Sequence, residues 1–153
     1  MKTKMTPFVL FLLIPLFTMA QAITGIEEIA PFSEGFAAIK KGEQWGFIDT
    51  KGDLVIDYRD DLVWDRSADP ATFGIMGVKY PSFKQGRCLV KKMEEGIPYY
   101  GFIDTSGKLI IDYQFLNVAQ YDSGYFTGII FEKVFRGENE FKLKVYDYKF
   151  HEV

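Results

Sequence analysis

The chain has 153 residues, of which 48% are hydrophobic and 17% aromatic, so it can bury a real core and is not expected to be disordered. Its net charge is −3, and it becomes −5 (16 basic against 21 acidic residues) when Lys2 and Lys4 in the first 22 residues are left out. This acidic balance excludes the basic footprint of a nucleic-acid-binding protein and a polybasic patch for anionic lipid.

Residues 1–22 have the pattern of a secretory signal peptide. Lys2 and Lys4 give a positive start, residues 8–17 carry no charge, and Ala20-Gln21-Ala22 is a small-x-small ending that predicts cleavage after Ala22. The alternative is a membrane anchor, but a span needs roughly 20 apolar residues, about twice the length of this run. We therefore expect a periplasmic or secreted protein without stable membrane insertion after cleavage.

Residues 32–58 predict three short strands joined by tight turns. Gly35 belongs to the first turn, and Asp49 can accept a hydrogen bond from the backbone two residues on while Gly52 takes a left-handed conformation. Trp45 begins the middle strand and is expected to anchor a core. The predicted strands are 36–40, 45–49 and 54–56. Each strand is too short to be stable alone, so we expect a β-meander that packs against neighbours.

Residues 59–82 are the least regular part and are interpreted as an insertion on one face of the array. Within them, residues 73–78 could form a strand interrupted by two glycines. A second copy of the meander follows over residues 83–113. Residues 92–99 predict a hairpin loop four residues longer than in the first copy. Cys88, the one cysteine, stands where the first copy has Ala37, so we expect a small buried residue rather than a reactive thiol.

A third, degenerate copy covers about residues 121–150. Its first residues match those from Phe32 onward at a shift of 89, and residues 140–150 alternate in the manner of a strand, but the Trp-Gly pair and the turn glycine are missing. A decayed terminal copy suits the capping unit that a repeat array requires.

We therefore predict one all-β domain over residues 23–153, built of short antiparallel strands in tandem β-meander repeats. Solenoid packing and barrel- or propeller-like packing both remain open. The residues expected to carry the repeated scaffold are Gly35, Trp45, Gly46, Asp49 and Gly52 in the first copy and Gly86, Tyr100, Gly101, Asp104 and Gly107 in the second.

These residues carry a resemblance to a known family. The first copy resembles the WG repeat of bacterial exported and cell-surface proteins through Tyr58, except that Asp57 replaces the usual proline. The second copy has Tyr100 in place of the tryptophan, and the third matches only at its start. The resemblance implies a β-rich protein that serves in binding or assembly, and it carries over no catalytic residue.

A search for chemistry gives no catalytic, cofactor or metal residue. His151 is the only histidine and lies third from the end, which is a poor place for a catalytic base, and with one cysteine a zinc site is not expected. The acids between Asp57 and Asp65 could hold Ca²⁺, although a solvated charged loop is the simpler interpretation. Asp49 and Asp104 could be a glycosidase pair, but each begins a turn in which Asp has a structural role.

Aromatic residues outside the motif strands are the remaining candidates. Trp64, Tyr80 and Tyr99 could contact a ligand, or they could cover the open ends of the sheets. We expect a non-enzymatic binding or assembly module of the bacterial envelope or secreted space, with a protein or glycan partner. The alternative is a carbohydrate-binding module, which needs three or more coplanar aromatics on one face, or a carbohydrate-active hydrolase, which needs a pocket of acids with perturbed pKa values.

Overall fold

The computed structural model describes residues 23–120 and 123–153. The predicted signal peptide, residues 1–22, lies outside the described residues, as do Tyr121 and Asp122 at the predicted start of the third copy. Within the described part of the chain, no helix is long and apolar enough to cross a membrane.

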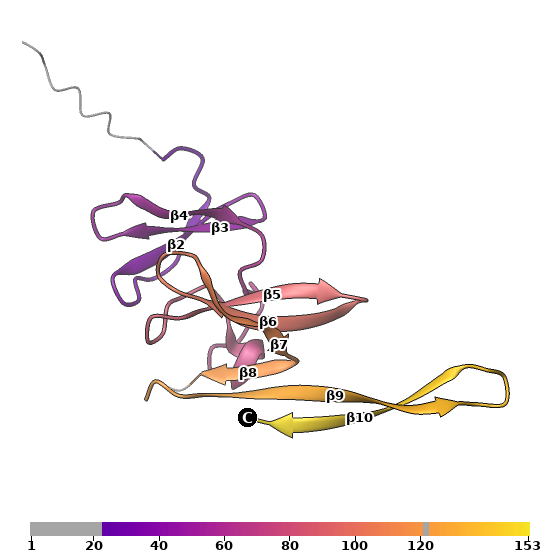
Figure 1. The fold of residues 1–153 in the computed structure, drawn as a ribbon. Helices are drawn as coiled ribbons and strands as arrows, with labels where there is room; N and C mark the ends of the chain where they lie inside the picture. Colours follow the sequence, from indigo (N-terminus) through magenta and orange to yellow (C-terminus); the bar gives the residue numbers. More distant parts are fainter. Residues whose placement is uncertain (1–22, 121–122) are drawn as a thin grey trace, which may run out of the picture.

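The all-β prediction is confirmed, with short strands in three antiparallel sheets (Figure 1). The N-terminal sheet has the order β1 (Glu28–Ile29), β2 (Phe36–Lys41), β3 (Gln44–Asp49) and β4 (Leu54–Arg59). The middle sheet has the order β5 (Cys88–Glu94), β6 (Ile97–Ile103) and β7 (Leu109–Phe115). The C-terminal sheet has the order β10 (Lys144–Glu152), β9 (Phe126–Glu138) and β8 (Asn117–Gln120).

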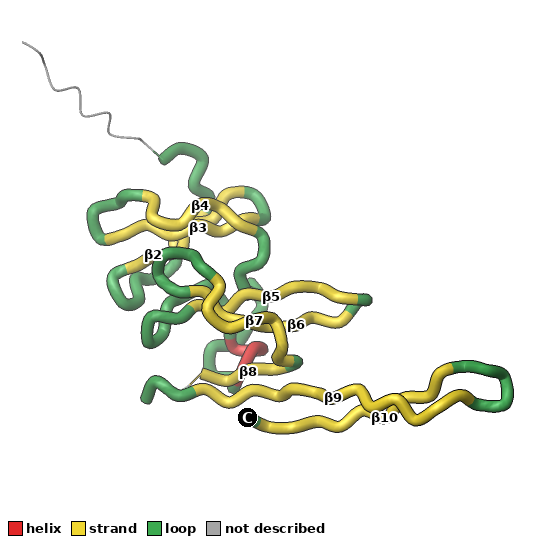
Figure 2. The backbone as a smooth tube through the Cα atoms, viewed as in Figure 1, coloured by secondary structure: helices red, strands yellow, loops and turns green. Residues whose placement is uncertain are grey.

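The middle sheet lies between the other two and contributes to two cores (Figures 1 and 2). Cys88 and Val90 belong to a cluster with Trp45 and Phe47 of the N-terminal sheet. Leu89 belongs to a second cluster with residues of the C-terminal sheet. Successive residues of a strand point to opposite faces, so one strand serves both cores. The described sheets stack in layers and do not close into a barrel.

The turn chemistry of the first two copies is the same. The Asp49 carboxylate accepts from the backbone N–H groups of Lys51 and Asp53 at 2.8 and 3.0 Å, and Gly52 has φ +87°. Asp104 accepts from Ser106 and Lys108 at 2.9 and 3.1 Å, and Gly107 has φ +81°. The carboxylates of Asp49 and Asp104 thus close turns, which is the structural role expected from the sequence.

Gly46 and Gly101, which follow Trp45 and Tyr100, are required for close packing of the backbone rather than for a turn. A Cβ on Gly46 would lie 2.8 Å from the Ile56 carbonyl oxygen, and one on Gly101 would lie 2.5 Å from that of Ile111. Both distances are shorter than a van der Waals contact with backbone. The glycines let the second and third strands of each meander approach.

Two equivalent turns also connect the first copy to the second. Glu34-Gly35 and Gln85-Gly86 occupy the two central positions of matching turns, each closed by a pair of backbone bonds. The Glu34 carboxylate accepts from the backbone N–H groups of Gln85 and Gly86 at 2.5 and 2.8 Å. One repeat's turn therefore binds the corresponding turn of the next.

The prediction of a long hairpin loop at residues 92–99 is wrong. The four extra residues lengthen both strands, β5 and β6, and the hairpin closes at the two-residue turn Glu95-Gly96. Lys91 still pairs with Tyr100, as Lys40 pairs with Trp45. An even insertion split between two strands preserves which side chains face the core, so the register is unaffected.

The inserted segment also differs from the prediction. The expected strand at residues 73–78 is a short 3₁₀-helix, η1 (Gly74–Gly77). Nearer its start, Leu62 pairs with Val90, and Lys91 N–H donates to the Asp61 carbonyl at 2.7 Å. Residues 61–63 thus lie beside β5 where the first copy has β1 beside β2.

The third copy has a turn of the same type that the sequence had not revealed, but in its other hairpin: β9 pairs with β8 as β2 pairs with β1, so β9 and β10 correspond to β2 and β3. The Asn139 side chain accepts from the backbone N–H groups of Phe141 and Leu143, both at 3.0 Å, and Lys142 has φ +58° at the turn position that Gly52 and Gly107 take in the Asp49 and Asp104 turns. This turn joins β9 and β10 into a long ribbon that extends past the other sheets (Figure 2). The ribbon of β9 and β10 is therefore a projecting arm that ends in this turn.

Candidate functional site: a cleft beneath the inserted segment

A cleft of about 570 Å³ lies between the inserted segment and the repeats. It is lined by residues from four parts of the chain, namely 31–33, the inserted segment up to Lys84, the start of β5 and the end of β8. Val63, Leu89 and Val118 are buried at its inner side, whereas Phe32 and Phe73 are 55% and 64% exposed at its mouth. Its size is in the range that binds small molecules or a peptide end.

The inserted segment holds its shape through local hydrogen bonds. The Asp65 carboxylate accepts from Ser67 N–H at 2.8 Å, and the Asp69 carboxylate accepts from Ala71 N–H at 3.0 Å. Asp65 N–H donates to the Val78 carbonyl at 2.9 Å, which brings the two ends of the segment together. The cleft wall is therefore braced by its own turns before any ligand binds.

The side chains that line the cleft differ in charge from the chain as a whole. None of the described residues that line it is an aspartate or glutamate, although the chain is acidic overall. Lys79 and Lys84 line it, together with hydroxyl and amide groups of Ser33, Thr72, Ser82 and Gln120. The Lys79 ammonium lies 5.8 Å from the centre of the Tyr80 ring. A lining that combines apolar side chains with hydroxyl, amide and cationic groups complements an anion that has an apolar part.

Cys88 lies beside this cleft but offers no nucleophile. It is 1% exposed, and burial raises the pKa of its thiol to about 12. A thiol with that pKa is neutral at physiological pH, and the thiolate is the reactive form. The expectation of a small buried residue agrees with this position.

Two of the three candidate ligand-contact aromatics lie near each other, and the third lies on another part of the molecule. Trp64 and Tyr80 both pack edge-on against Trp45, with ring centres 5.7 and 6.1 Å apart, and Tyr80 also lines the cleft. Tyr99 lies on β6 with its ring 6.0 Å from Phe131 of the ribbon. The structure therefore does not bring the three together, and Trp64 serves as a cover over the first repeat's core.

Aromatic side chains that the sequence had not singled out gather on the ribbon instead. Phe131 lies 5.8 Å from Tyr148 and 6.5 Å from Phe150, and Phe135 lies 5.5 Å from Tyr146. The ring planes in these pairs are tilted by 42–59°. They share one face of the ribbon but do not form the coplanar platform that stacks on a sugar.

The charged residues at the end of β4 and just after it form a clamp between repeats rather than a fully solvated loop. Arg59 donates to the Asp61 carboxylate through Nε at 2.5 Å and Nη2 at 2.7 Å, and through Nη1 to the Gly107 carbonyl at 3.0 Å. The Tyr113 hydroxyl donates to Asp61 at 3.0 Å. Burial acts to raise the pKa of Asp61, but the bonds from Arg59 and Tyr113 and the charge of Arg59 hold it below its usual value.

The other acidic candidates lie in ordinary surroundings. Asp49 and Asp104 are engaged in their turns, and the hydroxyl of Ser106 is the main cause that lowers the pKa of Asp104. His151 lies 4.0 Å from Glu132 on the exposed ribbon. Over residues 23–120 and 123–153, no group of three His, Cys, Asp or Glu side chains could hold a metal ion.

Sequence reasoning missed most of the cleft. Thr72, Phe73, Val78 and Lys79 come from a segment without periodicity, and they meet residues 31–33 and 118–120 only through the folding of the repeats. The one feature of the sequence that pointed to the cleft was the inserted segment, residues 59–82, which interrupts the repeat pattern. By contrast, Asn139 could have been found, since asparagine accepts the same turn bonds as aspartate.

Comparison with known proteins places the repeats in a family. A family model described as the WG containing repeat matches residues 26–45, 45–59 and 100–127. The second and third matches begin at the equivalent positions Trp45 and Tyr100, and the third runs through β7 and β8. No curated protein and no solved structure matches the chain. The repeated meanders, their shared turns and these matches show that the chain is a WG repeat-containing protein.

Proposed function

We propose that this chain is a non-enzymatic binding module of the bacterial envelope or secreted space, and that its cleft holds an apolar ligand with an anionic group. The WG repeats indicate a repeat-based binding module. The signal-peptide pattern of residues 1–22 supports a place outside the cytoplasm. The ligand is either a free aliphatic acid or the carboxyl end of a partner protein, because both present the same chemistry.

The observation that carries the proposal is the composition of the cleft. Its wall comes from the insertion between repeats, where the chain departs from its own scaffold. Its lining combines apolar side chains with Lys79 and Lys84 and, among the described residues, contains no acid. Loops held on a rigid β-scaffold are where binding residues concentrate.

The non-enzymatic part of the proposal rests on the same lining. The thiol of Cys88 is neutral at physiological pH because its pKa is about 12. A nucleophile needs a base within hydrogen-bond reach, and the one histidine, His151, lies on the ribbon. The hydroxyl and amide groups of the lining could also bind a sugar, so it is the two lysines that support an anionic ligand over a neutral glycan.

Calorimetric titration tests the proposal with three probes: decanoate, an apolar pentapeptide with a free carboxyl end, and decyltrimethylammonium. We expect decanoate or the peptide to bind and the cation, which has the same tail as decanoate, not to bind. Lys79→Met should weaken binding about 10-fold, and Ala71→Trp, which fills the cleft, should abolish it. Thr50→Trp in an exposed turn is the matched control.

The two carboxylate probes separate the two sources of the ligand, and a neutral oligosaccharide tests the glycan alternative. Equal binding of decanoate and decyltrimethylammonium would show that the lysines of the cleft do not select an anionic group. Unchanged binding in Ala71→Trp would show that the cleft is not the site. Binding of the oligosaccharide alone would replace the proposal with the carbohydrate-binding alternative.

A further inference from the structure

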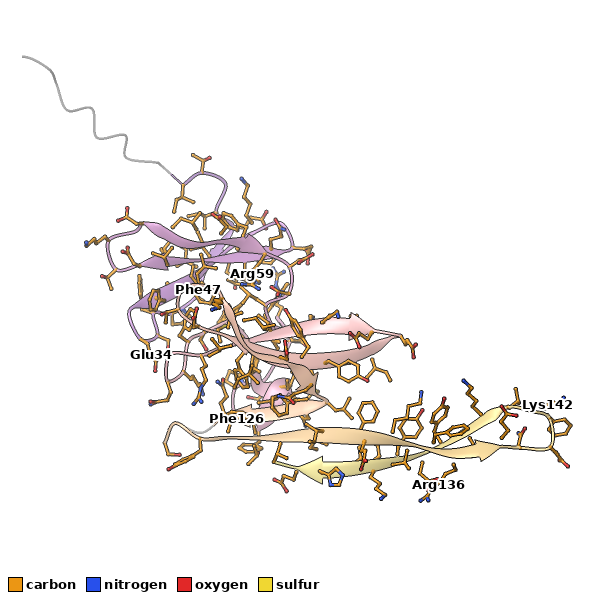
Figure 3. The ribbon with its side chains drawn as sticks, in the orientation of Figure 1. Glu34, Phe47, Arg59, Phe126, Arg136 and Lys142 are labelled. Carbon is orange, nitrogen blue, oxygen red and sulfur yellow. The ribbon has the colours of Figure 1, made fainter. Side chains whose placement is uncertain are left out.

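The ribbon of β9 and β10 ends the sheet with an open edge. In the order β10-β9-β8, strand β10 has a neighbour on one side, and in the described residues no strand pairs with its other side. Figures 1 and 3 show the ribbon extending beyond the middle sheet, with Lys142 at its tip. An exposed edge of this kind offers a row of N–H and C=O groups to another strand.

The two faces of the ribbon differ in character. One face carries three cross-strand pairs, Phe131 with Phe150, Lys133 with Tyr148 and Phe135 with Tyr146. The Lys133 ammonium lies 4.2 Å from the Tyr146 ring, and Phe135, Tyr148 and Phe150 are all more than half exposed. The other face mixes charged side chains with Ile130 and Val134, and it holds the ion pair between Arg136 and Asp147 at 2.5 Å. Figure 3 shows Arg136 on the side away from the middle sheet.

The backbone pattern tells which residues of β10 bond outward. Val153 and Gly128 exchange both hydrogen bonds, at 2.8 and 2.9 Å. In an antiparallel pair, such positions alternate with pairs whose N–H and C=O groups point away from each other. Counting back along the register, Glu152, Phe150, Tyr148 and Tyr146 therefore direct their backbone groups to the open edge.

We propose that a second copy of this chain pairs with β10 along this edge, antiparallel and about a two-fold axis at Tyr148. This register puts Tyr148 opposite its own copy, with its outward N–H and C=O groups exchanging both bonds. It also puts Asp147 opposite Lys149, and Tyr146 opposite Phe150. The strand is thus complementary to itself in charge, and the aromatic face of one ribbon continues onto the next.

Neighbouring registers lose this complementarity. A two-fold axis at Phe150 puts Lys149 opposite His151 and Tyr148 opposite Glu152, and an axis at Tyr146 puts Asp147 opposite Val145. An axis at Asp147 puts two acids directly opposite each other and an axis at Lys149 puts two lysines there, and like charges in directly opposed positions destabilise a pair of strands. The bulge between Val145 and Tyr146 ends the flat stretch, so pairing extends over residues 146–152.

A two-fold pairing closes on itself and gives a dimer rather than a fibre. Charged residues on an edge strand usually prevent such pairing. Here the charges alternate in sign so that a second copy satisfies them, whereas an unrelated strand does not. The inference concerns the ribbon and stands independently of what the cleft binds.

Sedimentation equilibrium of the full chain, purified as expressed, tests the pairing at about 100 µM protein. We expect a dimer. Tyr148→Pro removes an outward N–H without removing a bond to β9, and it should give a monomer with unchanged circular dichroism. Tyr148→Phe, which keeps the N–H and the ring, should remain dimeric.

The charge argument has its own test in two single variants. Lys149→Asp puts two acids in each contact and Asp147→Lys puts two bases there, so each alone should dimerise at least about 10-fold more weakly. An equimolar mixture of the two variants restores opposite charges at both contacts and should form a heterodimer. A monomeric wild-type chain, or a Tyr148→Pro variant that dimerises like wild type, would overturn the proposal. So would a mixture that associates no better than either variant alone.

Discussion

Arg59 and Asp61 form a two-pronged ion pair at the junction between the first and second repeats, with N–O distances of 2.5 and 2.7 Å. The same guanidinium reaches the Gly107 carbonyl in the second repeat's turn, and Tyr113 of the second repeat completes the coordination of Asp61. The clamp joins two sheets that share one core. Its strength should therefore appear in the stability of the whole domain.

The clamp predicts a pH dependence of stability. The folded pKa of Asp61 is lowered, so its contribution is present above its unfolded value of about 3.9 and is lost as pH falls through the folded value. Asp61→Asn should cost about 1–3 kcal/mol at pH 7, since it leaves a half-buried guanidinium without its carboxylate. Urea unfolding at pH 7 and pH 3 should show the gap from wild type narrowing in acid.

The matched control for this variant is Asp60→Asn at the exposed neighbouring residue, which should change stability by less than about 0.5 kcal/mol. A gap between wild type and Asp61→Asn that is the same at both pH values would mean that the ionised carboxylate adds nothing to the junction.

Close strand approach at Gly101 predicts a large effect from the smallest side chain. Gly101→Ala would place Cβ 2.5 Å from a backbone oxygen, so we expect a loss of at least about 2 kcal/mol. Gly52→Ala should cost only about 1 kcal/mol, because space is open there and the penalty comes from φ +87° alone. Urea denaturation compares the two, and equal costs would refute close approach as the reason for Gly101.

The third turn predicts a stabilising substitution. Lys142 holds φ +58° at the turn position that Gly52 and Gly107 take in the turns of the same type closed by Asp49 and Asp104. Lys142→Gly removes the strain of a side chain in this region, worth about 1 kcal/mol, and should slow amide exchange in β9 and β10 about 5-fold. Lys144→Gly, at the first residue of β10, should accelerate it because glycine weakens a strand. Faster exchange in Lys142→Gly would show that strain at the Lys142 turn does not lower the local stability of the ribbon.

Burial of Cys88 predicts that its thiol reacts only after unfolding. With a pKa of about 12 and 1% exposure, it should resist an aromatic disulfide reagent at pH 8 in the native protein. Labelling followed across a urea series should rise along the same curve as the loss of tryptophan fluorescence. Rapid labelling in buffer would mean that the native protein opens at the cleft often enough to expose the Cys88 thiol to the reagent.

The repeated parts of the fold could be predicted from the sequence because their residues act through contacts with near neighbours in the chain. Asp49 and Gly52 close a turn within five residues, and Trp45 alternates with Phe47 along a strand, so both patterns are visible in one copy and repeat in the next. Cys88 could be placed because it occupies the position of Ala37. These predictions needed no knowledge of how the sheets stack.

The rest depends on contacts between distant segments. The longer hairpin could not be told from a longer loop, because the difference lies in whether Met93 and Pro98 pair. The cleft requires residues 31–33, 70–84 and 118–120 to meet, and no pattern along the chain relates them. The Asn139 turn was not predicted because it has asparagine and Lys142 in place of aspartate and glycine, and because it closes the hairpin that corresponds to β2 and β3 rather than to β3 and β4.

Amide chemical shifts measured during a decanoate titration test whether the cleft beneath the inserted segment is the place where the module binds. We expect the largest changes at Thr72, Phe73, Val78, Lys79 and Leu89, and we expect the ribbon amides of β9 and β10 not to shift. Changes confined to the ribbon, or none in the cleft at saturating decanoate, would contradict this expectation.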